Sequence, residues 1–506
     1  MSRSNGFRYT TIFIYITVLS VLTLIFSACS NDSDLMSRKS GETGNSQTES
    51  TNTDSSGEHT SLETSLTPKV KFNDETFVFL SREDGVGAWT ILDAYAESMK
   101  GEILNDTIYE RNNKVTDDCG VIINQVLSRD IISEVKNSVQ SGSCDYDAVI
   151  ANSEMNVDLA ASSCLYDMNE MPEINFDNSW WDKAANENLS LFGKQFYAIS
   201  DMNVMAFDAT WITMANIEVL DNLGIKIDEI YDTVRRGEWT LDRYREVSDM
   251  NCYDYNNNSK TDSEDLYGTV MQGHGADGFI IGCGIKFIDR QDDGTISLVP
   301  LNETYVNIFD KISSIVNKKK AFNSHDSSQN DMYSRDTEYG QVIFSENRAI
   351  FFTETLQCVR RLREMETSFG IIPMPKADEK QENYISMVHW WATSMLSVPL
   401  NAPDTYKTAV VLEYMSWLSS ETVKPVYYDI VIRDKYFRDE TSSEMLDYAM
   451  QERVIDLGHI LLGDSTIISK IRSMLYDGDS SYASTYASNE KSVNKMVERK
   501  FKDLID

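Results

Sequence analysis

Short apolar runs alternate with amphipathic stretches in the first part of the chain. Residues 76–80, 121–125 and 146–151 are rich in β-branched and aromatic side chains, which predicts three buried strands. Residues 89–99 and 131–139 carry apolar side chains at helical spacing. The order strand, helix, strand, helix, strand predicts an α/β lobe with a largely parallel sheet.

The rest of the chain keeps this mixed pattern and adds turn and cap signals. The predicted elements are a helix that begins at residues 237–242 with Thr240 as its N-cap, a hairpin between 287–288 and 296–298 with its turn at Asp292-Asp293-Gly294, a buried strand at 349–352, and a mostly helical tail from Tyr406. Trp239 opens the capped helix, and we expect it in the core.

The N-terminus has the pattern of an export signal. Arg3 and Arg8 precede an apolar stretch at 12–26, and Ser27-Ala28 leads directly to Cys29. A basic start, a short apolar segment and small residues at a cut site indicate a lipoprotein signal at 1–28, with Cys29 acylated after cleavage. An uncleaved transmembrane anchor is the alternative, but the stretch is shorter than the roughly 18 to 20 residues that span a bilayer.

Residues 29–68 contain almost nothing apolar to bury, so we expect a flexible tether that holds the rest at the outer face of the cytoplasmic membrane.

The remainder of the 506 residues is too long for one ordinary core, which favours two lobes. The net charge of −34 opposes phosphate backbones and argues against nucleic acid.

Six cysteines follow Cys29, and no Cys-x-x-Cys spacing occurs. Zinc and dithiol redox sites are therefore weakly supported, while disulfides and buried free thiols both remain open.

Several motifs, in their order along the chain, resemble extracellular solute-binding protein family 1. These are the lipid-anchored receptors of ABC importers, related in fold to maltose-binding protein. The resemblance runs from about residue 77 to 505. It is carried by residues 106–112 (DTIYERN), 179–182 (SWWD), 237–242 (GEWTLD), 265–268 (DLYG), 370–375 (GIIPMP), 427–429 (YYD), 435–439 (KYFRD) and 443–447 (SEMLD).

The resemblance implies a type II periplasmic-binding-protein-like fold: two α/β lobes joined by crossing hinge strands near 196–207 and 384–398. It implies a monomer that closes on a solute, with a sugar or oligosaccharide as the expected class, and docks on an ABC permease; the chain has no Walker motif of its own. The expected parts are 69–205 for the first lobe, 206–383 for the second, 384–425 for the return to the first, and 426–506 for a mainly helical part of the second.

Sugars are held by aromatic faces and by side chains that bond hydroxyl groups. The polar loop 81–87 follows the first strand, at the strand end where such sheets bind ligands. The expected ligand-binding residues are Arg82, Glu83, Asp84, Trp180, Asp201, Thr353, Glu354, Trp390 and Trp391. For the aromatic residues, packing in the core or hinge is the alternative; for Arg82 and Glu83 it is a solvated loop.

Residues 254–265 place oxygen atoms at the spacing of an EF-hand loop. The candidate calcium ligands are Asp254, Asn256, Asn258, Lys260, Asp262 and Asp265. Ser259 stands where the loop needs Gly, and Asp265 stands where the bidentate Glu belongs, so a purely structural polar loop is the alternative. Such calcium is structural; no cofactor is expected to be required.

Enzyme signatures are otherwise absent. The Gly-x-Gly-x-x-Gly at 273–278 lacks a convincing long helix after it, and neither His-Glu-x-x-His nor Gly-x-Ser-x-Gly occurs. We expect a binding protein rather than an enzyme. Two alternatives stay open: a surface enzyme acting on glycosides, and a sensor lipoprotein that presents its ligand to a membrane receptor kinase.

Overall fold

The computed structural model divides the chain into two units, Met1–His59 and Thr60–Asp506. It describes residues 67–85, 89–290, 296–324, 326, 329, 339–362, 365–433, 440–463 and 466–505, all of which belong to the second unit. The predicted signal, Cys29, nearly all of the tether, the turn at 292–294 and the motif at 435–439 lie outside these residues. Across the described ranges, no helix is long and apolar enough to span a bilayer.

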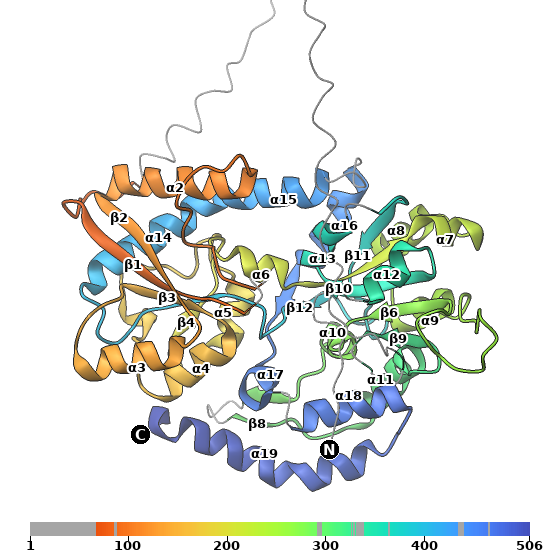
Figure 1. Cartoon of the computed structure of the whole chain (residues 1–506). Coiled ribbons are helices and arrows are strands. Elements are labelled where there is room, and N and C mark those ends of the chain that lie inside the picture. The colour runs from red at the N-terminus through yellow and green to blue at the C-terminus, as the bar shows by residue number, and fades with distance from the viewer. Residues whose placement is uncertain are drawn as a thin grey trace, which may run out of the picture. The chain divides into compact units, whose positions relative to one another are not determined.

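The first lobe is built on a five-stranded sheet in the order β2-β1-β3-β13-β4 (Figure 1). Its strands are β1 (Glu75–Arg82), β2 (Val121–Ser128), β3 (Ala148–Ala151), β4 (Tyr197–Ala198) and β13 (Met395–Ser397). β1 pairs in parallel with β2 and β3, while β13 runs antiparallel to β3 and β4. The three strands predicted in this region are therefore confirmed.

The second lobe has its own five-stranded sheet in the order β11-β5-β10-β6-β9. Its strands are β5 (Trp211–Asn216), β6 (Tyr267–Met271), β9 (Ala321–Asn323), β10 (Ala349–Thr355) and β11 (Phe369–Ile372). β6 is parallel to β10 and β9, and β5 is antiparallel to β10 and β11. The predicted hairpin is present as β7 (Ile288–Arg290) and β8 (Ile296–Leu298).

Helices cover both sheets. Those connecting or covering the first are α2 (Ile103–Cys119), α3 (Ile131–Ser141), α4 (Ser153–Ala161), η1 (Met168–Glu170), α5 (Lys183–Leu189) and α14 (Thr405–Glu421). Those around the second are α7 (Ile217–Asn222), α8 (Ile227–Arg235), α9 (Leu241–Ser248), α10 (Gly275–Gly282), α11 (Glu303–Val316), α12 (Tyr339–Ser345), α13 (Gln357–Arg361) and α16 (Glu440–Met450). Thr240 caps α9 as predicted, and Trp239 is fully buried.

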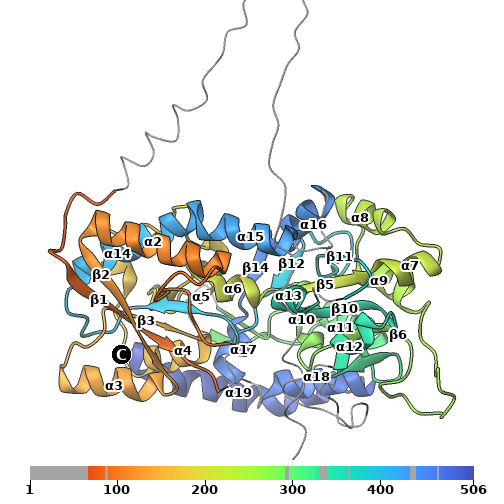
Figure 2. The same ribbon diagram turned by 45° about the horizontal axis from the view of Figure 1, so that its top comes forward.

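In the residues that the structure describes, the chain passes between the two lobes at three places. The first passage runs from β4 through the short helix α6 (Val204–Asp208) to β5. The second runs from β11 through β12 (Ile385–Met387) to β13. The third joins α14 to α15 (Val423–Arg433), which crosses above the sheets in Figure 2. The fold is therefore the expected two-lobed α/β arrangement with crossing hinge segments.

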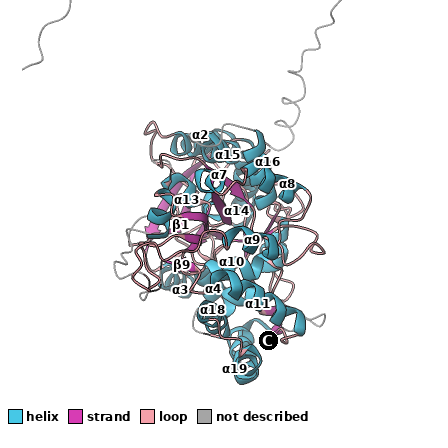
Figure 3. Cartoon of the chain, turned by 90° about the vertical axis from the view of Figure 1, so that its right-hand side faces the viewer, coloured by secondary structure: helices cyan, strands magenta, loops and turns pink. Residues whose placement is uncertain are grey.

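The helical tail also touches both lobes. It comprises β14 (Glu452–Val454), α17 (Leu457–Leu462), α18 (Ile467–Asp477) and α19 (Tyr482–Ile505). α19 packs on β8 and on α4 of the first lobe, and α18 packs on α10 and α11. Figure 3 shows α18 and α19 on the side of the molecule opposite to α2 and α15.

The prediction of a helix at 89–99 is wrong. This segment is irregular, and the helix begins later, at Ile103, with Glu102 as its N-cap. The Arg111 guanidinium takes the carbonyls of Asp93 and Ala94 as hydrogen-bond acceptors, at 2.9 and 3.1 Å. Those carbonyls are therefore not available for the i to i+4 bonds of a helix.

The cysteines whose bridging was left open include several buried thiols. Cys119, Cys164 and Cys283 are buried and form no disulfide, and burial raises the pKa of each thiol. Of the two alternatives, these three cysteines are therefore buried free thiols and not disulfide partners.

Gly268 in β6 provides a test of packing in the second lobe. A Cβ atom at this position would lie 1.9 Å from the Ser248 carbonyl oxygen, so Gly268→Ala should lower the free energy of unfolding by about 3 kcal/mol. Urea denaturation measures the change. Gly85→Ala is the matched control because a Cβ there meets nothing within 4 Å. Equal stability of the two variants would contradict this packing.

Candidate functional site

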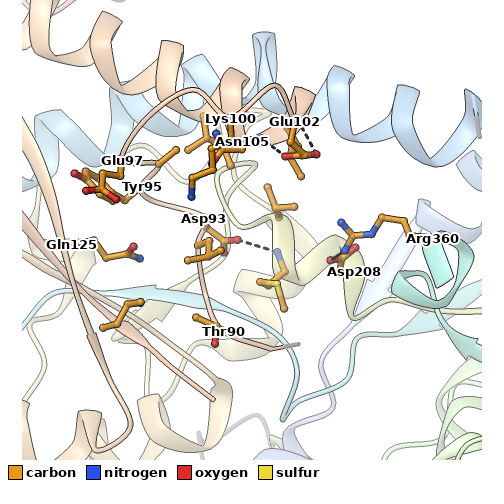
Figure 4. A pocket seen from close by; sticks show the side chains of 17 residues that line it. Thr90, Asp93, Tyr95, Glu97, Lys100, Glu102, Asn105, Gln125, Asp208 and Arg360 are labelled. Atoms are coloured by element: carbon orange, nitrogen blue, oxygen red, sulfur yellow. Dashed lines mark hydrogen bonds and ion pairs between the residues drawn. The ribbon is translucent and has the colours of Figure 1, made fainter. Parts of the chain in front are cut away.

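A pocket of about 520 Å³ lies where the two lobes meet the first passage (Figure 4). Its wall comes from the segment 90–108 after β1, from Gln125 and Leu127 of β2, from Val204, Met205 and Asp208 around α6, and from Arg360 of α13 in the second lobe. The pocket is therefore lined by both lobes and by a segment that joins them.

The wall combines polar groups with exposed apolar surface. Gln125 donates to the Ile91 carbonyl at 3.1 Å, and Asn105 donates to the Ser98 carbonyl at 2.8 Å. Tyr95 supplies an aromatic ring, while Leu92 and Leu127 are 53% and 42% exposed. Such a wall suits a ligand with hydroxyl groups and apolar faces.

The buried Asp208 and the partly buried Arg360 form an ion pair at one end of the pocket. The Tyr427 hydroxyl of α15 donates to the other carboxylate oxygen at 2.7 Å. Burial raises the pKa of Asp208, and Arg360 opposes that shift. The pair joins α6 to the second lobe and to the third passage.

Asp93 forms the middle of the wall, and its carboxyl group is buried. One oxygen accepts the Met205 amide at 3.2 Å and the other accepts the Ser394 hydroxyl at 2.5 Å. Burial raises the pKa of Asp93 to about 7, against the opposing effect of these two hydrogen bonds.

Two further acidic groups are paired around α6. Lys424 of α15 contacts both carboxylate oxygens of Asp201 at 3.0 Å. Arg453 of β14 bonds to Asp182 and donates to the Ala206 carbonyl of α6 at 3.3 Å. The first passage is thus held by cations from two other segments.

None of the expected ligand residues lines this pocket. Arg82 ends β1 and stacks over the Trp391 ring at 4.0 Å, with a hydrogen bond to the Trp391 carbonyl at 2.7 Å. Trp391 is 40% exposed, so part of its surface is accessible.

Asp84 accepts the Trp89 amide at 2.8 Å and the Thr90 hydroxyl at 3.3 Å, and Thr90 itself lines the pocket. Glu83 instead pairs with Arg129 at 3.1 Å.

The remaining expected residues have other surroundings. Trp180 donates to Glu413 of α14 at 3.1 Å. Asp201 pairs with Lys424, as described above. Thr353 is fully buried among hydroxyl groups, 3.4 Å from that of Tyr244. Glu354 is buried next to it and accepts the Thr355 amide at 2.7 Å.

Trp390 packs among histidines. Its ring centroid is 4.4 Å from those of His389 and His459, and the residue is only 3% exposed. The packing alternative therefore describes its surroundings better than an open ligand face does. The ligand roles of all nine residues stay predictions.

The pocket residues that sequence reasoning missed are chiefly Asp93, Gln125, Asp208 and Arg360. Asp93 was missed because residues 89–99 were predicted to form a helix, and a regular helix gave no indication that the Asp93 carboxyl group faces the hinge. The motif at 106–112 held a usable signal: Arg111 and Asn112 are buried and bind the backbone of this loop.

The calcium-like loop is held by hydrogen bonds from its own backbone and side-chain amides to its carboxylates. Asp254 accepts the amides of Asn258 and Ser259 at 3.1 and 2.7 Å, and Asp262 accepts the Asn258 amide group at 2.7 Å. Ser259, where Gly was wanted, has a φ of 60°. In the part of the chain that the structure describes, no group of three or more His, Cys, Asp or Glu residues is arranged to hold a metal ion. Calcium binding stays a prediction.

Comparison with known proteins rests on structure. Neither a protein-family model nor a curated protein sequence matches the chain. The sugar-binding protein MalE from Xanthomonas citri superposes with a TM-score of 0.57 at 11% identity, over 85% of this chain and 99% of that one. A cyclic α-maltosyl-1,6-maltose binding protein from Arthrobacter globiformis gives 0.54 at 12% identity, over 84% and 100%.

An ABC substrate-binding protein from Listeria monocytogenes, in complex with cycloalternan, gives a TM-score of 0.52 at 14% identity, over 83% of this chain and 98% of that one. The chain has the fold of ABC solute-binding proteins. The fold expected from the sequence motifs is thereby confirmed. All three of these proteins are binding proteins by their descriptions.

The Asp208–Arg360 pair gives a test of this site. Asp208→Ala should lower the free energy of unfolding by about 3 kcal/mol, because it leaves a partly buried guanidinium without this carboxylate. Chemical denaturation at pH 7 checks the loss. Asp177→Ala, which breaks the exposed pair with Lys183, is the control and should leave stability unchanged. A loss no larger than that of the control would show that the Asp208–Arg360 pair does not hold the passage.

Proposed function

We propose that this protein is the solute-binding component of an ABC importer and that it captures a sugar or oligosaccharide in the pocket between its lobes. The observation that carries the proposal is the composition of the pocket wall, which comes from the first lobe, from α6 and from Arg360 of the second lobe. A ligand that contacts all three favours one arrangement of the lobes over others, which is how hinge closure is driven.

The sugar assignment is supported by the chemistry of the wall. Gln125, Asn105 and Tyr95 offer neutral hydrogen-bonding groups, and Leu92 and Leu127 offer apolar contact. Carbohydrates present hydroxyl edges and C–H faces that match such a mixture. Two of the proteins with this fold named above are described as binding a sugar or a maltosyl-maltose, which also supports a carbohydrate ligand.

The mechanism is reversible binding without covalent chemistry. The closed form would dock on a pair of permease subunits in the membrane, which a separate ATPase drives. Cys29 would carry the lipid that keeps the protein at the outer face of the cytoplasmic membrane, with residues 30–68 as the tether. We expect a monomer that requires no cofactor; structural calcium at 254–265 belongs to the same proposal.

A sugar panel tests the proposal. Thermal unfolding of the full-length protein with mono- and oligosaccharides should show a saturable rise in melting temperature for one class of sugar. A ligand at about 100 times its Kd adds roughly 2.7 kcal/mol to stability. The sugar should be recovered unchanged; consumption of the sugar would instead indicate an enzyme. No shift with any sugar in a folded sample would remove the carbohydrate assignment.

A pair of tyrosine variants locates the site. Tyr95 lines the pocket, so Tyr95→Ala should weaken binding of the responding sugar by 10-fold or more, about 1.4 kcal/mol. Tyr253 is 62% exposed and lies outside the pocket, so Tyr253→Ala should bind normally. Calorimetric titration of both variants decides the matter. Equal affinities would place the sugar elsewhere.

The lipid anchor has a separate test. In cells fed radioactive palmitate, the wild-type protein should be labelled and should fractionate with membranes, and Cys29→Ala should lose both properties. Cys144→Ala is the matched control, because that cysteine is exposed in the folded body and should not carry the lipid. Label retained by Cys29→Ala would refute the anchor.

A further inference from the structure

The carboxyl group of Asp93 joins two of the three passages between the lobes. Its Oδ1 accepts the Met205 amide of α6, in the first passage, and its Oδ2 accepts the Ser394 hydroxyl just before β13, in the second. Asn203, next to α6, donates to the same Ser394 hydroxyl at 3.3 Å. The first and second passages therefore meet at one buried side chain, and Figure 4 shows this side chain in the pocket wall.

The backbone at Asp93 is also tied to the third passage. The buried Arg111 of α2 donates to the Asp93 carbonyl at 2.9 Å and to the Ser419 hydroxyl of α14 at 3.0 Å. Asn112 donates to the Ala94 carbonyl at 2.9 Å. The pocket loop 89–102 is thus fixed by its backbone on one side and by one carboxyl group on the other.

We propose that Asp93 is the positioning residue that couples the pocket to the hinge, because its carboxyl group fixes the pocket loop to the first and second passages together. When the lobes move, the wall carrying Tyr95, Leu92 and Thr90 moves with them. The solute-binding role of this wall rests on the function proposed above, whereas the coupling itself is a property of the unliganded protein.

The coupling responds to protons. Burial disfavours the charged form of Asp93 and raises its pKa to about 7, while the Ser394 and Met205 hydrogen bonds and the buried Arg111 favour the charge and Asp208 opposes it. A carboxyl group released into water ionises at its ordinary pKa near 3.9. The fixed state thus binds the proton more tightly than the released state, and its advantage is lost as pH rises from about 4 to about 7.

Amide hydrogen exchange of the unliganded full-length protein tests this proposal. Exchange rates of peptides covering 203–209 and 392–397 are divided by their intrinsic rates at pH 5.5 and pH 8. With pKa values of about 7 and 3.9, release should become roughly 30-fold more favourable between these pH values at both passages. Asp93→Asn should abolish this change, since its amide donates to Ser394 and its oxygen accepts from Met205 without titrating.

Two controls separate coupling from simple packing. Asp93→Ala should lose protection from amide exchange at both passages at either pH. If that variant does not fold, Ser394→Ala takes its place. It removes one of the two bonds and should release the second passage more than the first. A wild-type protein and Asp93→Asn with the same pH dependence would overturn the proposal. A change confined to one passage would also overturn it.

Sugar binding then separates this proposal from the function. Maltose, maltotriose and maltotetraose are titrated into the wild type and Asp93→Asn at both pH values. For any of them that binds, affinity should fall at pH 8 in the wild type and stay constant in Asp93→Asn. If none binds, these sugars are removed from the proposed function, while the exchange result still decides the role of Asp93.

Discussion

The paired charges around α6 are the constraint on which the rest of the structure depends. Asp208, Asp201 and Asp182 bring carboxyl groups to the first passage, and Arg360, Lys424 and Arg453 meet them from the second lobe, from α15 and from β14. Removing Arg360 would leave the buried Asp208 carboxylate without this cation, which costs several kcal/mol. The sequence therefore limits the lobe arrangements to those in which these groups stay paired.

The pocket follows from that constraint. Because α6 must stay close to α13 and α15, the loop after β1 and the edge strand β2 are left facing Asp208 and Arg360 across about 520 Å³. The ring of Phe207, buried in α6, packs 4.8 Å from the guanidinium carbon of Arg453, which adds an apolar contact to the paired charges. A ligand bound there touches the same segments that set the angle between the lobes. This arrangement is what a binding protein that signals occupancy by closure requires.

Local patterns in the sequence predicted most of the strands and several helices, because apolar runs such as 76–80 and 349–352 contribute mostly buried side chains to the sheets. The prediction of a helix at 89–99 failed. Its apolar residues have helical spacing, but Arg111 donates hydrogen bonds to two backbone carbonyls that a helix would need. The candidate ligand residues were chosen by chemistry and position along the chain, and side chains such as Trp180 and Thr353 turned out to have partners inside one lobe. Which carboxyl groups face the pocket depends on long-range pairs, such as Asp93 with Ser394. No local pattern encodes such pairs.

Small-angle X-ray scattering of the full-length protein during a sugar titration tests the central claim most directly. If a sugar binds between lobes that pivot about α6, the radius of gyration should fall as the sites fill and should level off at the stoichiometry found by calorimetry. A radius that stays constant through saturation, with binding established calorimetrically on the same sample, would contradict closure about this hinge.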